Sequence, residues 1–239
     1  MLDLGSSDRQ IRILLQKNAE FWTKDRSLTA LFAYVVLDTF VLLPFTQSKI
    51  GELSYSVIYS MILVSGVFAI GAKLKTKVAI LALALGCFVI RWLSFINPVL
   101  EVKIADDIFS ILFFSSLTLF VLWHIFKEGD VSLHRIQGAV AVYVIIGLIF
   151  SKAYHLIFLI DHNAFFLSQP MIEGELFYTR FVNFSYVTLT TLWLGDITPI
   201  NLGAKSLVMI EGLVGQLFPA IMITRLVTLE IESRKKKTA

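Results

Sequence analysis

The residues whose types favour ion chemistry lie in one stretch, Phe184–Pro199, which reads FSYVTLTTLWLGDITP. Threonine hydroxyls and backbone carbonyls can replace the water around a monovalent cation, and a carboxylate such as Asp196 concentrates cations nearby. The stretch lies between two long apolar segments, but it is too short and too irregular to cross a bilayer. Non-helical backbone at membrane depth survives only where protein buries it or where it lines a water-filled cavity. The sequence therefore predicts a re-entrant pore element here.

Holding such an element in a bilayer requires long apolar helices around it. Of the 239 residues, 56% are hydrophobic, and a transmembrane helix needs about 20 mostly apolar residues. Six segments meet this need: Leu28–Gln47, Leu53–Ala72, Lys77–Ile96, Ile104–Phe126, Ile136–Ile160 and Leu207–Leu229. The sequence thus predicts an all-α membrane protein with six transmembrane helices. We expect a re-entrant pore helix, Phe177–Leu192, and a filter loop between the fifth and sixth helices.

Lysine and arginine gather on one side of these spans. They are Arg9, Arg12, Lys17, Lys24 and Arg26, then Lys73, Lys75 and Lys77, then Lys127 and Arg135, and finally Arg234–Lys237. The opposite side carries Lys49, Lys103, Arg180 and Lys205. Because basic loops remain in the cytoplasm, both termini are expected to be cytoplasmic.

The spans divide the chain into four predicted parts. Residues 1–27 form a cytoplasmic N-terminus, in which residues 8–24 have the spacing of an interfacial amphipathic helix. Residues 28–127 form a four-helix transmembrane region, 132–232 a pore domain, and 233–239 a basic cytoplasmic tail suited to anionic lipids. The four-helix region lacks an arginine-rich voltage sensor, because its fourth span carries no arginine or lysine.

Ionisable residues inside spans are costly, and they are usually paired or functional. Asp38, Arg91, Asp106 and Asp107 lie inside the first four spans. We expect Arg91 to pair with one of these carboxylates in a structural ion pair that ties the helices together. Lys152 and His155 lie three residues apart and therefore share one face of the fifth span. For His155, a pH sensor and an ordinary interface residue are both open interpretations.

The order of span, pore helix, T-T-L-x-x-G-D, proline and span resembles the pore module of the potassium-channel superfamily. The likeness covers about two fifths of the chain, and SLHRIQGAVAVY and EGLVGQLFPAIMITRLVTLE are similar to bacterial pore-loop channels. Matched to the family filter T-V-G-Y-G-D, the filter positions are Thr191, Leu192, Trp193, Leu194, Gly195 and Asp196. The resemblance also implies a hinge at Gly215 and a homotetramer in a bacterial inner (plasma) membrane.

Trp193 departs from that filter pattern. A potassium filter points successive carbonyls at one axis, which requires alternating handedness, and glycine supplies this without a Cβ clash. Leu194 at the tyrosine position keeps a compatible backbone, but Trp193 replaces the first glycine. A left-handed non-glycine residue costs about 1–2 kcal/mol, and four indoles have no room at one axis. We therefore expect the backbone to rearrange and the central carbonyl sites to be lost or reshaped.

Three outcomes of this substitution remain open. The indoles turn outward behind the filter and leave a wider, hydrated passage, or Trp193 and Leu194 block the axis as a hydrophobic constriction. In the third outcome the protein has the shape of a pore but is silent. The leading hypothesis is a homotetrameric cation channel with weak selectivity for potassium over sodium. A non-conducting sensor or scaffold with a channel fold is the alternative.

The filter residues have expected roles in the leading hypothesis. Thr190, Thr191 and Leu192 form the lower filter, and the permeant potassium or sodium ion binds at Thr191 and Leu192. No other cofactor is expected. Gly195 provides the outer turn, and Asp196 contributes to a ring of negative charge at the mouth.

The last span carries the remaining predicted site residues. Gly212, Gly215 and Pro219 let the helix bend, and Met222 and Leu226 form an apolar gate. Glu211 is either a pore-lining acid or a buried partner of the pore helix. We favour the buried partner, because a carboxylate deep in a membrane is costly unless it is paired.

Other function classes find little support in the sequence. The four histidines lack metal-ligand spacing and no nucleophile–base pair is visible, which argues against an enzyme. The net charge of +3 reflects the basic cytoplasmic ends and does not indicate nucleic-acid binding. The single cysteine, Cys87, excludes a disulfide within one chain. No cleavable signal peptide is evident.

Overall fold

The structure, a computed structural model, describes residues 29, 31–42, 49–69, 74–126, 133–168 and 177–238. The predicted amphipathic helix at residues 8–24 lies outside this part of the chain. In chain order the elements are η1 (Leu37–Leu42), α2 (Lys49–Ala69), α3 (Leu74–Ile96), α4 (Leu100–Phe126), α5 (Leu133–Ile160), η3 (His162–Ala164), β1 (Phe165–Leu167), α6 (Phe177–Leu189), β2 (Ile197–Pro199) and α7 (Leu202–Thr238). Helices dominate because backbone groups in a bilayer must bond within their own segment.

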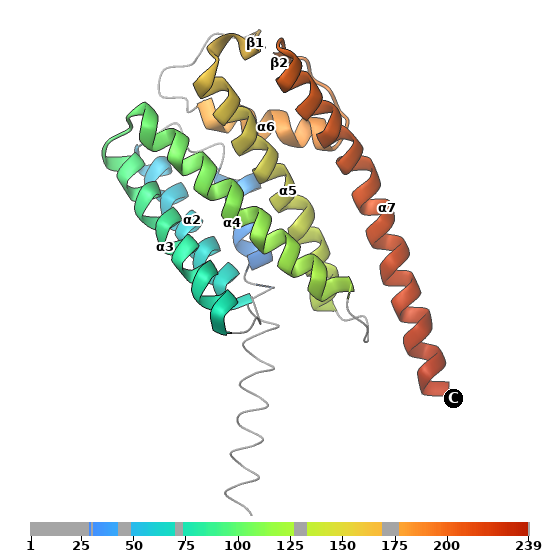
Figure 1. Cartoon of the computed structure of the whole chain (residues 1–239). Coiled ribbons are helices and arrows are strands. Elements are labelled where there is room, and N and C mark those ends of the chain that lie inside the picture. Colours follow the sequence, from blue (N-terminus) through green and yellow to red (C-terminus); the bar gives the residue numbers. More distant parts are fainter. Residues whose placement is uncertain are drawn as a thin grey trace, which may run out of the picture.

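Four of the described helices are long and apolar enough to cross a membrane. They cover Thr76–Ile96 in α3, Leu100–Trp123 in α4, Arg135–Ile160 in α5 and Leu202–Ile231 in α7. Two shorter apolar helices, Leu31–Val41 and Leu53–Val67, correspond to the first two predicted spans. Each of those predicted spans lies partly outside the described residues. Figure 1 shows α2, α3, α4 and α5 as neighbours in one bundle, in which α3 packs on both α2 and α4.

α6 is too short to cross a bilayer. Its 13 residues correspond to a length of about 20 Å, and Figure 1 shows it lying across the bundle between α5 and α7. The helix ends at Leu189, three residues before the predicted end, because the chain already turns at Thr190 and Thr191. α7 begins at Leu202, five residues before the predicted start of the sixth span.

A two-stranded sheet, which was not predicted from the sequence, joins the two sides of the predicted filter at residues 190–196, called the filter stretch below. β1, which follows α5, pairs antiparallel with β2, which follows the filter, and Phe166 lies opposite Thr198. Aromatic and β-branched residues favour such short strands. The Ile200 N–H also donates to the Ala164 carbonyl at 2.7 Å. The sheet therefore ties the outer end of the filter stretch to the end of α5.

Two clusters of buried side chains form the core. The larger cluster fills the bundle and includes Tyr59, Phe113 and Leu117. The smaller cluster is aromatic and packs α5, the sheet and α6 together. In it the ring centroids of Tyr154 and Phe184 lie 5.1 Å apart in an edge-to-face arrangement. Such pairs contribute about 0.5–1.5 kcal/mol beyond their buried area, so α6 is firmly packed against α5.

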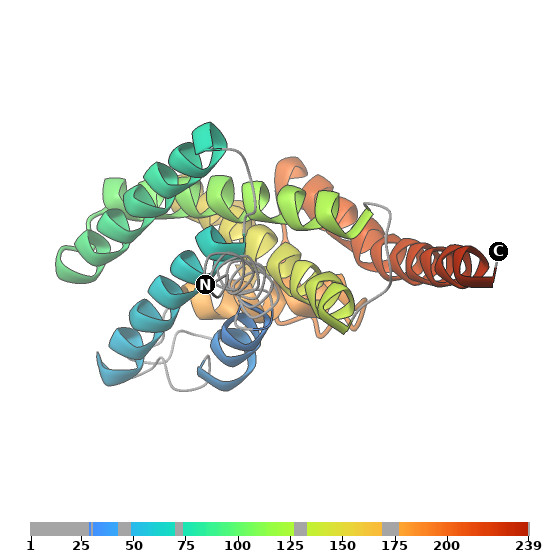
Figure 2. The ribbon, with the colours of Figure 1, turned by 90° about the horizontal axis from the view of Figure 1, so that it is seen from below.

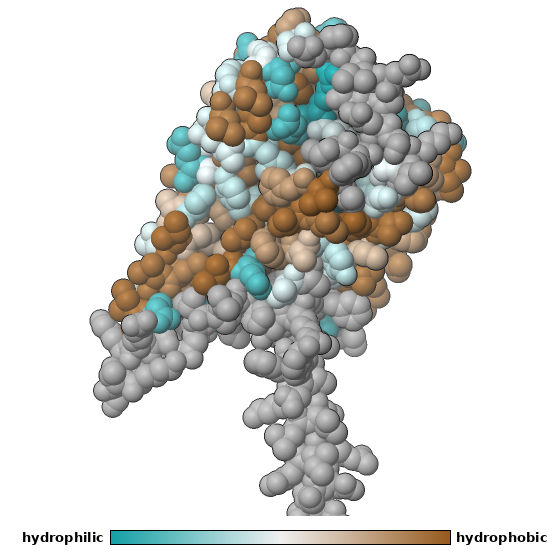
Figure 3. Space-filling view, turned by 180° about the vertical axis from the view of Figure 1, so that it is seen from behind, coloured by the Kyte–Doolittle hydropathy of each residue, from teal (hydrophilic) through white to brown (hydrophobic). Residues whose placement is uncertain are grey.

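α7 leaves much of its apolar surface uncovered. It contacts α5, α6 and β2, and Figure 1 and Figure 2 show it diverging from the bundle towards its C-terminal end. Its exposed large hydrophobic residues are Leu202, Met209, Ile210, Leu213, Leu217, Ile221, Ile223, Val227 and Ile231. In Figure 3 hydrophobic residues cover the middle and lower part of the described surface, whereas hydrophilic ones gather near the top. Lipid or other copies of the chain must therefore cover α7.

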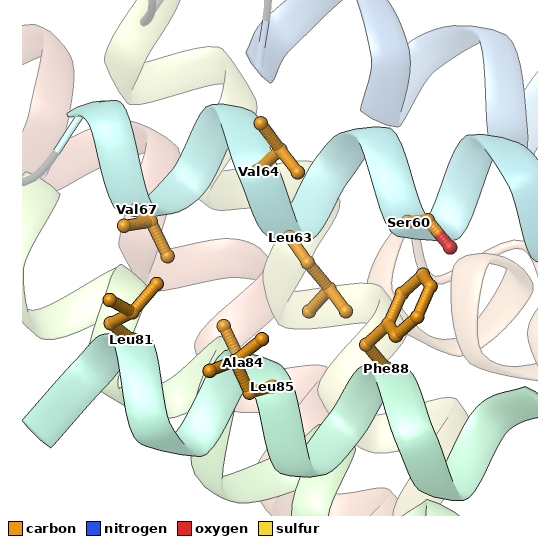
Figure 4. Close-up of a pocket in the computed structure, with 8 residues that line it drawn as sticks. All are labelled: Ser60, Leu63, Val64, Val67, Leu81, Ala84, Leu85 and Phe88. Atoms are coloured by element: carbon orange, nitrogen blue, oxygen red, sulfur yellow. The ribbon is translucent and has the colours of Figure 1, made fainter.

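α2 and α3 pack loosely along part of their contact. They enclose a hollow of about 320 Å³, shown in Figure 4. Its lining residues are Ser60, Leu63, Val64, Val67, Leu81, Ala84, Leu85 and Phe88. In Figure 1 these two helices lie on the side of the bundle away from α7. The hollow therefore belongs to the four-helix region and not to the filter.

Candidate functional site

The filter stretch starts where α6 ends. The Thr191 N–H donates to the Thr188 carbonyl at 3.0 Å, and the Leu192 N–H donates to the Val187 carbonyl at 2.9 Å. With Thr191 at φ 60°, these two bonds form a Schellman motif, which satisfies carbonyls at a helix C-terminus. Glycine usually occupies this left-handed position, and threonine occupies it here. The motif turns the chain sharply out of the helix and into the filter stretch.

Left-handed residues alternate with ordinary ones along the filter stretch. The φ angles are 60° at Thr191, 45° at Trp193 and 76° at Gly195. Such alternation turns the carbonyls of successive residues to the same side, which a carbonyl-lined filter requires. The expected rearrangement of the backbone at Trp193 is therefore wrong for this structure. The indole is 54% exposed. Within one chain, the energetic cost of Trp193 is therefore the steric strain between its Cβ and its own left-handed backbone.

Asp196 and the sheet hold the outer end of the filter stretch. The carbonyl of Asp196 accepts hydrogen bonds from the N–H and the hydroxyl of Ser168, both at 3.0 Å. Its carboxylate accepts a bond from the Ile197 N–H at 3.0 Å. The side chain is partly exposed, whereas Leu192 and Leu194 are exposed. The two ends of the stretch are thus bonded to neighbouring elements, and its middle is free to face other chains.

Glu211 is fully buried and joins three helices. The Tyr154 hydroxyl on α5 and the Ser185 hydroxyl on α6 each donate to its carboxylate at 2.5 Å. Burial in a low dielectric strengthens such hydrogen bonds. Of the two predicted roles for Glu211, this geometry favours the buried partner of the pore helix. The carboxylate fastens the middle of α6 to α5 and α7.

A hollow lies between the start of the filter stretch and α7. Its volume is about 380 Å³, and its lining residues are Thr191, Met209, Gly212, Leu213 and Gln216. Gly212, a predicted hinge residue, has open space where a Cβ would stand. Thr191 and this face of α7 line the same hollow. In a channel, this face of α7 would therefore line the inner cavity below the filter.

Gly215, the other predicted hinge glycine, occupies a different environment. It is buried, and a Cβ added there would collide with the backbone carbonyl of Leu189 at the end of α6. The Tyr143 hydroxyl donates to that same carbonyl at 3.3 Å. Gly215 therefore lets α7 pass directly against the end of α6. Pro219 lies inside α7, which continues through it to Thr238.

The predicted gate at Met222 and Leu226 is not supported by the packing. Met222 is 4% exposed and belongs to the core cluster, and Leu226 packs against that cluster. Both side chains therefore point towards the core of their own chain, and they do not lie on the face of α7 that lines the hollow. Helical spacing continues the hollow face from Gln216 to Ile223 and Val227, which are 64% and 53% exposed. The prediction missed this because several faces of α7 are apolar.

Buried charges gather where the four-helix region meets α5. Arg91 bonds to Asp106 at 3.2 Å, which is the kind of pair that the sequence analysis expected. Lys152 lies 2.9 Å from Asp106 and 3.0 Å from Asp107, and His155 Nδ1 lies 2.6 Å from Asp107. The sequence analysis missed the pairing of Lys152, although a lysine inside a span needs a partner. Asp38 is also buried, and its Oδ1 has no hydrogen-bond partner among the described residues.

Comparison with known proteins supports a channel. Residues 138–232 match a protein family described as "Ion channel". Searches of curated proteins and of solved structures returned no significant match. The matched segment contains most of α5, all of α6, the filter stretch and most of α7. The match at residues 138–232 supports a pore-loop, potassium-channel-like ion channel module in an all-α, multi-pass membrane protein.

Proposed function

We propose that four copies of the chain form a cation channel, in which the filter stretches surround one axis. The observation that carries this proposal is the alternation of left-handed residues at Thr191, Trp193 and Gly195, directly after a re-entrant helix. One such stretch cannot enclose an axis by itself. The uncovered apolar surface of α7 supports assembly, because helices of neighbouring copies can cover it.

In this proposal the lower filter consists of Thr190, Thr191 and Leu192. Their carbonyls and the threonine hydroxyls replace water around a potassium or sodium ion, which binds at Thr191 and Leu192. Asp196 contributes to a ring of negative charge at the outer mouth, where it raises the local cation concentration. The hollow beside Gly212 becomes part of the inner cavity, with no further cofactor.

We propose weak selectivity for potassium over sodium. Trp193 keeps a left-handed backbone at a cost of about 1–2 kcal/mol, so four copies store roughly 4–8 kcal/mol in one ring. Outward-turned indoles relieve crowding at the axis and leave a wider, hydrated passage. A Cβ at this position alters the spacing of the carbonyls from that of a glycine filter, and carbonyl spacing is one of the factors that separate the two ions.

The gate and the membrane orientation complete the proposal. Ile223 and Val227 replace Met222 and Leu226 as the apolar constriction, and Gly212 and Pro219 allow α7 to bend above it. The channel is a bacterial inner-membrane protein with both termini in the cytoplasm. The basic tail, residues 233–239, contacts anionic lipid headgroups there.

Ion flux from liposomes tests the proposal. Purified protein should form a tetramer by mass measurement and should release both potassium and sodium down their gradients. A Thr191→Pro variant, which disrupts the filter, is the control for leakage. Strict potassium selectivity would contradict the argument from Trp193.

A non-conducting sensor or scaffold is the second candidate. It is favoured by the three large apolar side chains that stand exposed in the filter stretch, Leu192, Trp193 and Leu194. Absence of flux from a folded tetramer, together with flux restored by Trp193→Gly and Leu194→Tyr, would support this candidate. Such a result would place the block in the filter itself.

A further inference from the structure

Lys152 is a buried cation that joins two parts of the molecule. It lies on α5 in the channel module, it is 1% exposed, and its Nζ contacts carboxylates of both Asp106 and Asp107 on α4. A lysine head group inside a span is costly unless its partners are well placed. Here the partners belong to the four-helix region, so the ion pairs connect that region to the channel module.

The same ammonium group contacts the first turn of α6. Lys152 Nζ lies 4.2 Å from the centroid of the Tyr178 ring, within cation–π range. His155, which is bonded to Asp107, meets Tyr178 edge to face with 5.9 Å between ring centroids. Tyr178 also packs on Tyr55 of α2 at 5.7 Å. The start of α6 is therefore in contact with groups held by the four-helix region.

The C-terminal half of α6 is hydrogen-bonded to the channel module, and Tyr186 also contacts the four-helix region through Thr39 at 3.4 Å and through the ring of Phe40. The Tyr186 hydroxyl donates to the Val144 carbonyl at 2.7 Å, and Ser185 donates to Glu211. The four-helix region therefore meets α6 near both ends, and the contacts of Tyr178 with Lys152, His155 and Tyr55 hold the end that lies farther from the filter. A rigid helix of this length transmits a displacement of one end to the other.

We propose that Lys152 is a positioning residue through which the four-helix region holds α6, and with it the filter, in its orientation. This inference rests on the proposed function, because it assigns the first four helices a role in setting ion permeation. Removing Lys152 takes one positively charged partner away from the buried carboxylates of Asp106 and Asp107. It also removes the cation that lies over the Tyr178 ring.

Arg91 provides a matched control. It also pairs with Asp106, and its guanidinium lies over Tyr55 at 4.5 Å and Tyr59 at 5.8 Å on α2. Arg91→Met therefore removes a largely buried cation, with a side chain 12% exposed, from the same cluster without removing the contact between Lys152 and Tyr178. A purely structural role of the cluster predicts similar effects of Arg91→Met and Lys152→Met.

The experiment compares the ratio of potassium to sodium flux in liposomes for five proteins. These are the native chain, Lys152→Met, Lys152→Arg, Tyr178→Leu and Arg91→Met. Lys152→Met and Tyr178→Leu should shift the ratio by about 2- to 30-fold, the range found for coupled positions. Lys152→Arg should retain most of the native ratio, and Arg91→Met, which reaches Tyr178 only through Tyr55, should shift the ratio much less than Lys152→Met. Equal shifts for Lys152→Met and Arg91→Met would overturn the proposal.

Hydrogen exchange of the α6 amides separates this inference from the proposed function. Lys152→Met should speed exchange at the start of α6 in the folded protein, and Arg91→Met should not. If the native chain carries no ions, the proposed conduction fails while the exchange result still tests the positioning role. If Lys152→Met does not fold, Tyr178→Leu against Tyr178→Phe makes the same test with the ion pairs intact. Unchanged exchange in Tyr178→Leu would overturn the proposal.

Discussion

At Trp193 the backbone has φ 45°, a conformation that a Cβ disfavours by about 1–2 kcal/mol. The neighbouring Thr191 bears the same cost, but the Schellman bonds at the end of α6 hold it in place. Trp193 has no such local bond among the contacts described for the filter stretch. The left-handed backbone of Trp193 is therefore held by the path of the chain between Thr191 and Gly195, which are also left-handed.

Trp193→Gly should therefore stabilise the chain. Removing the Cβ relieves the left-handed strain, so thermal unfolding in detergent should show a gain of about 1–2 kcal/mol per chain. Leu194→Gly is the control, because the structure gives Leu194 no positive φ. If Trp193→Gly and Leu194→Gly change the free energy of unfolding equally, then Trp193 does not strain the backbone.

Gly215 and Gly212 differ in the space around them, although they lie three residues apart on α7. Gly215→Ala should destabilise the protein by about 1–3 kcal/mol, because its methyl group meets the Leu189 backbone. Gly212→Ala faces open space, and higher helix propensity should make it neutral or stabilising by about 1 kcal/mol. Thermal unfolding of the two variants measures both effects.

At the scale of elements, α6 is held by polar bonds at its middle and by packing along its length. Glu211 bonds to α5 through Tyr154 and to α6 through Ser185. The aromatic cluster around Phe165 and Phe181 covers the same side of α6. A re-entrant helix does not span the bilayer, so the two membrane interfaces do not fix its position. The contacts with α5 and α7 fix it instead.

Glu211→Ala should therefore cost more than Tyr154→Phe. The alanine leaves the Tyr154 hydroxyl without its acceptor, at about 1–3 kcal/mol for an unsatisfied group, and it removes the bond that joins Ser185 to α7, although the Ser185 hydroxyl keeps the Gly147 carbonyl as an acceptor at 2.7 Å. Tyr154→Phe removes a single donor and keeps the ring in the aromatic cluster. Chemical denaturation of the two variants in detergent gives the comparison. A smaller loss for Glu211→Ala than for Tyr154→Phe would mean that the carboxylate does not join the helices.

At the scale of the whole molecule, α7 is the element that a single chain leaves unfinished. Its exposed apolar residues lie on several faces, whereas its buried residue Met222 belongs to the core cluster of the bundle. A tetramer around the hollow face would bring copies of Ile223 together near the axis. It would keep copies of Met222 apart, each against its own bundle.

Cysteine cross-linking distinguishes these two faces. In a Cys87→Ala background, Ile223→Cys should form dimers under mild oxidation in native membranes, because neighbouring copies meet there. Met222→Cys should remain monomeric under the same conditions. Cross-linking at both positions, or at Met222→Cys alone, would contradict the assigned pore face of α7.

The amino-acid sequence by itself determined the features that depend on local composition. Apolar runs of sufficient length specify membrane helices wherever they occur, and the TTLWLGD segment predicts a pore element because it lies between two such runs and is too short and irregular to cross a bilayer. The need to pair a buried carboxylate likewise pointed to a partner for Glu211. None of these inferences required knowing which helices touch.

The tertiary structure alone decided the features that depend on which faces meet. Lys152 pairs with Asp106 and Asp107 because α5 lies beside α4, and Met222 is buried because one particular face of α7 contacts the core. The left-handed backbone at Trp193 is set by the elements that fasten both ends of the filter stretch. Contacts between residues far apart in the chain have no signature in local spacing, and for this reason the sequence left them open.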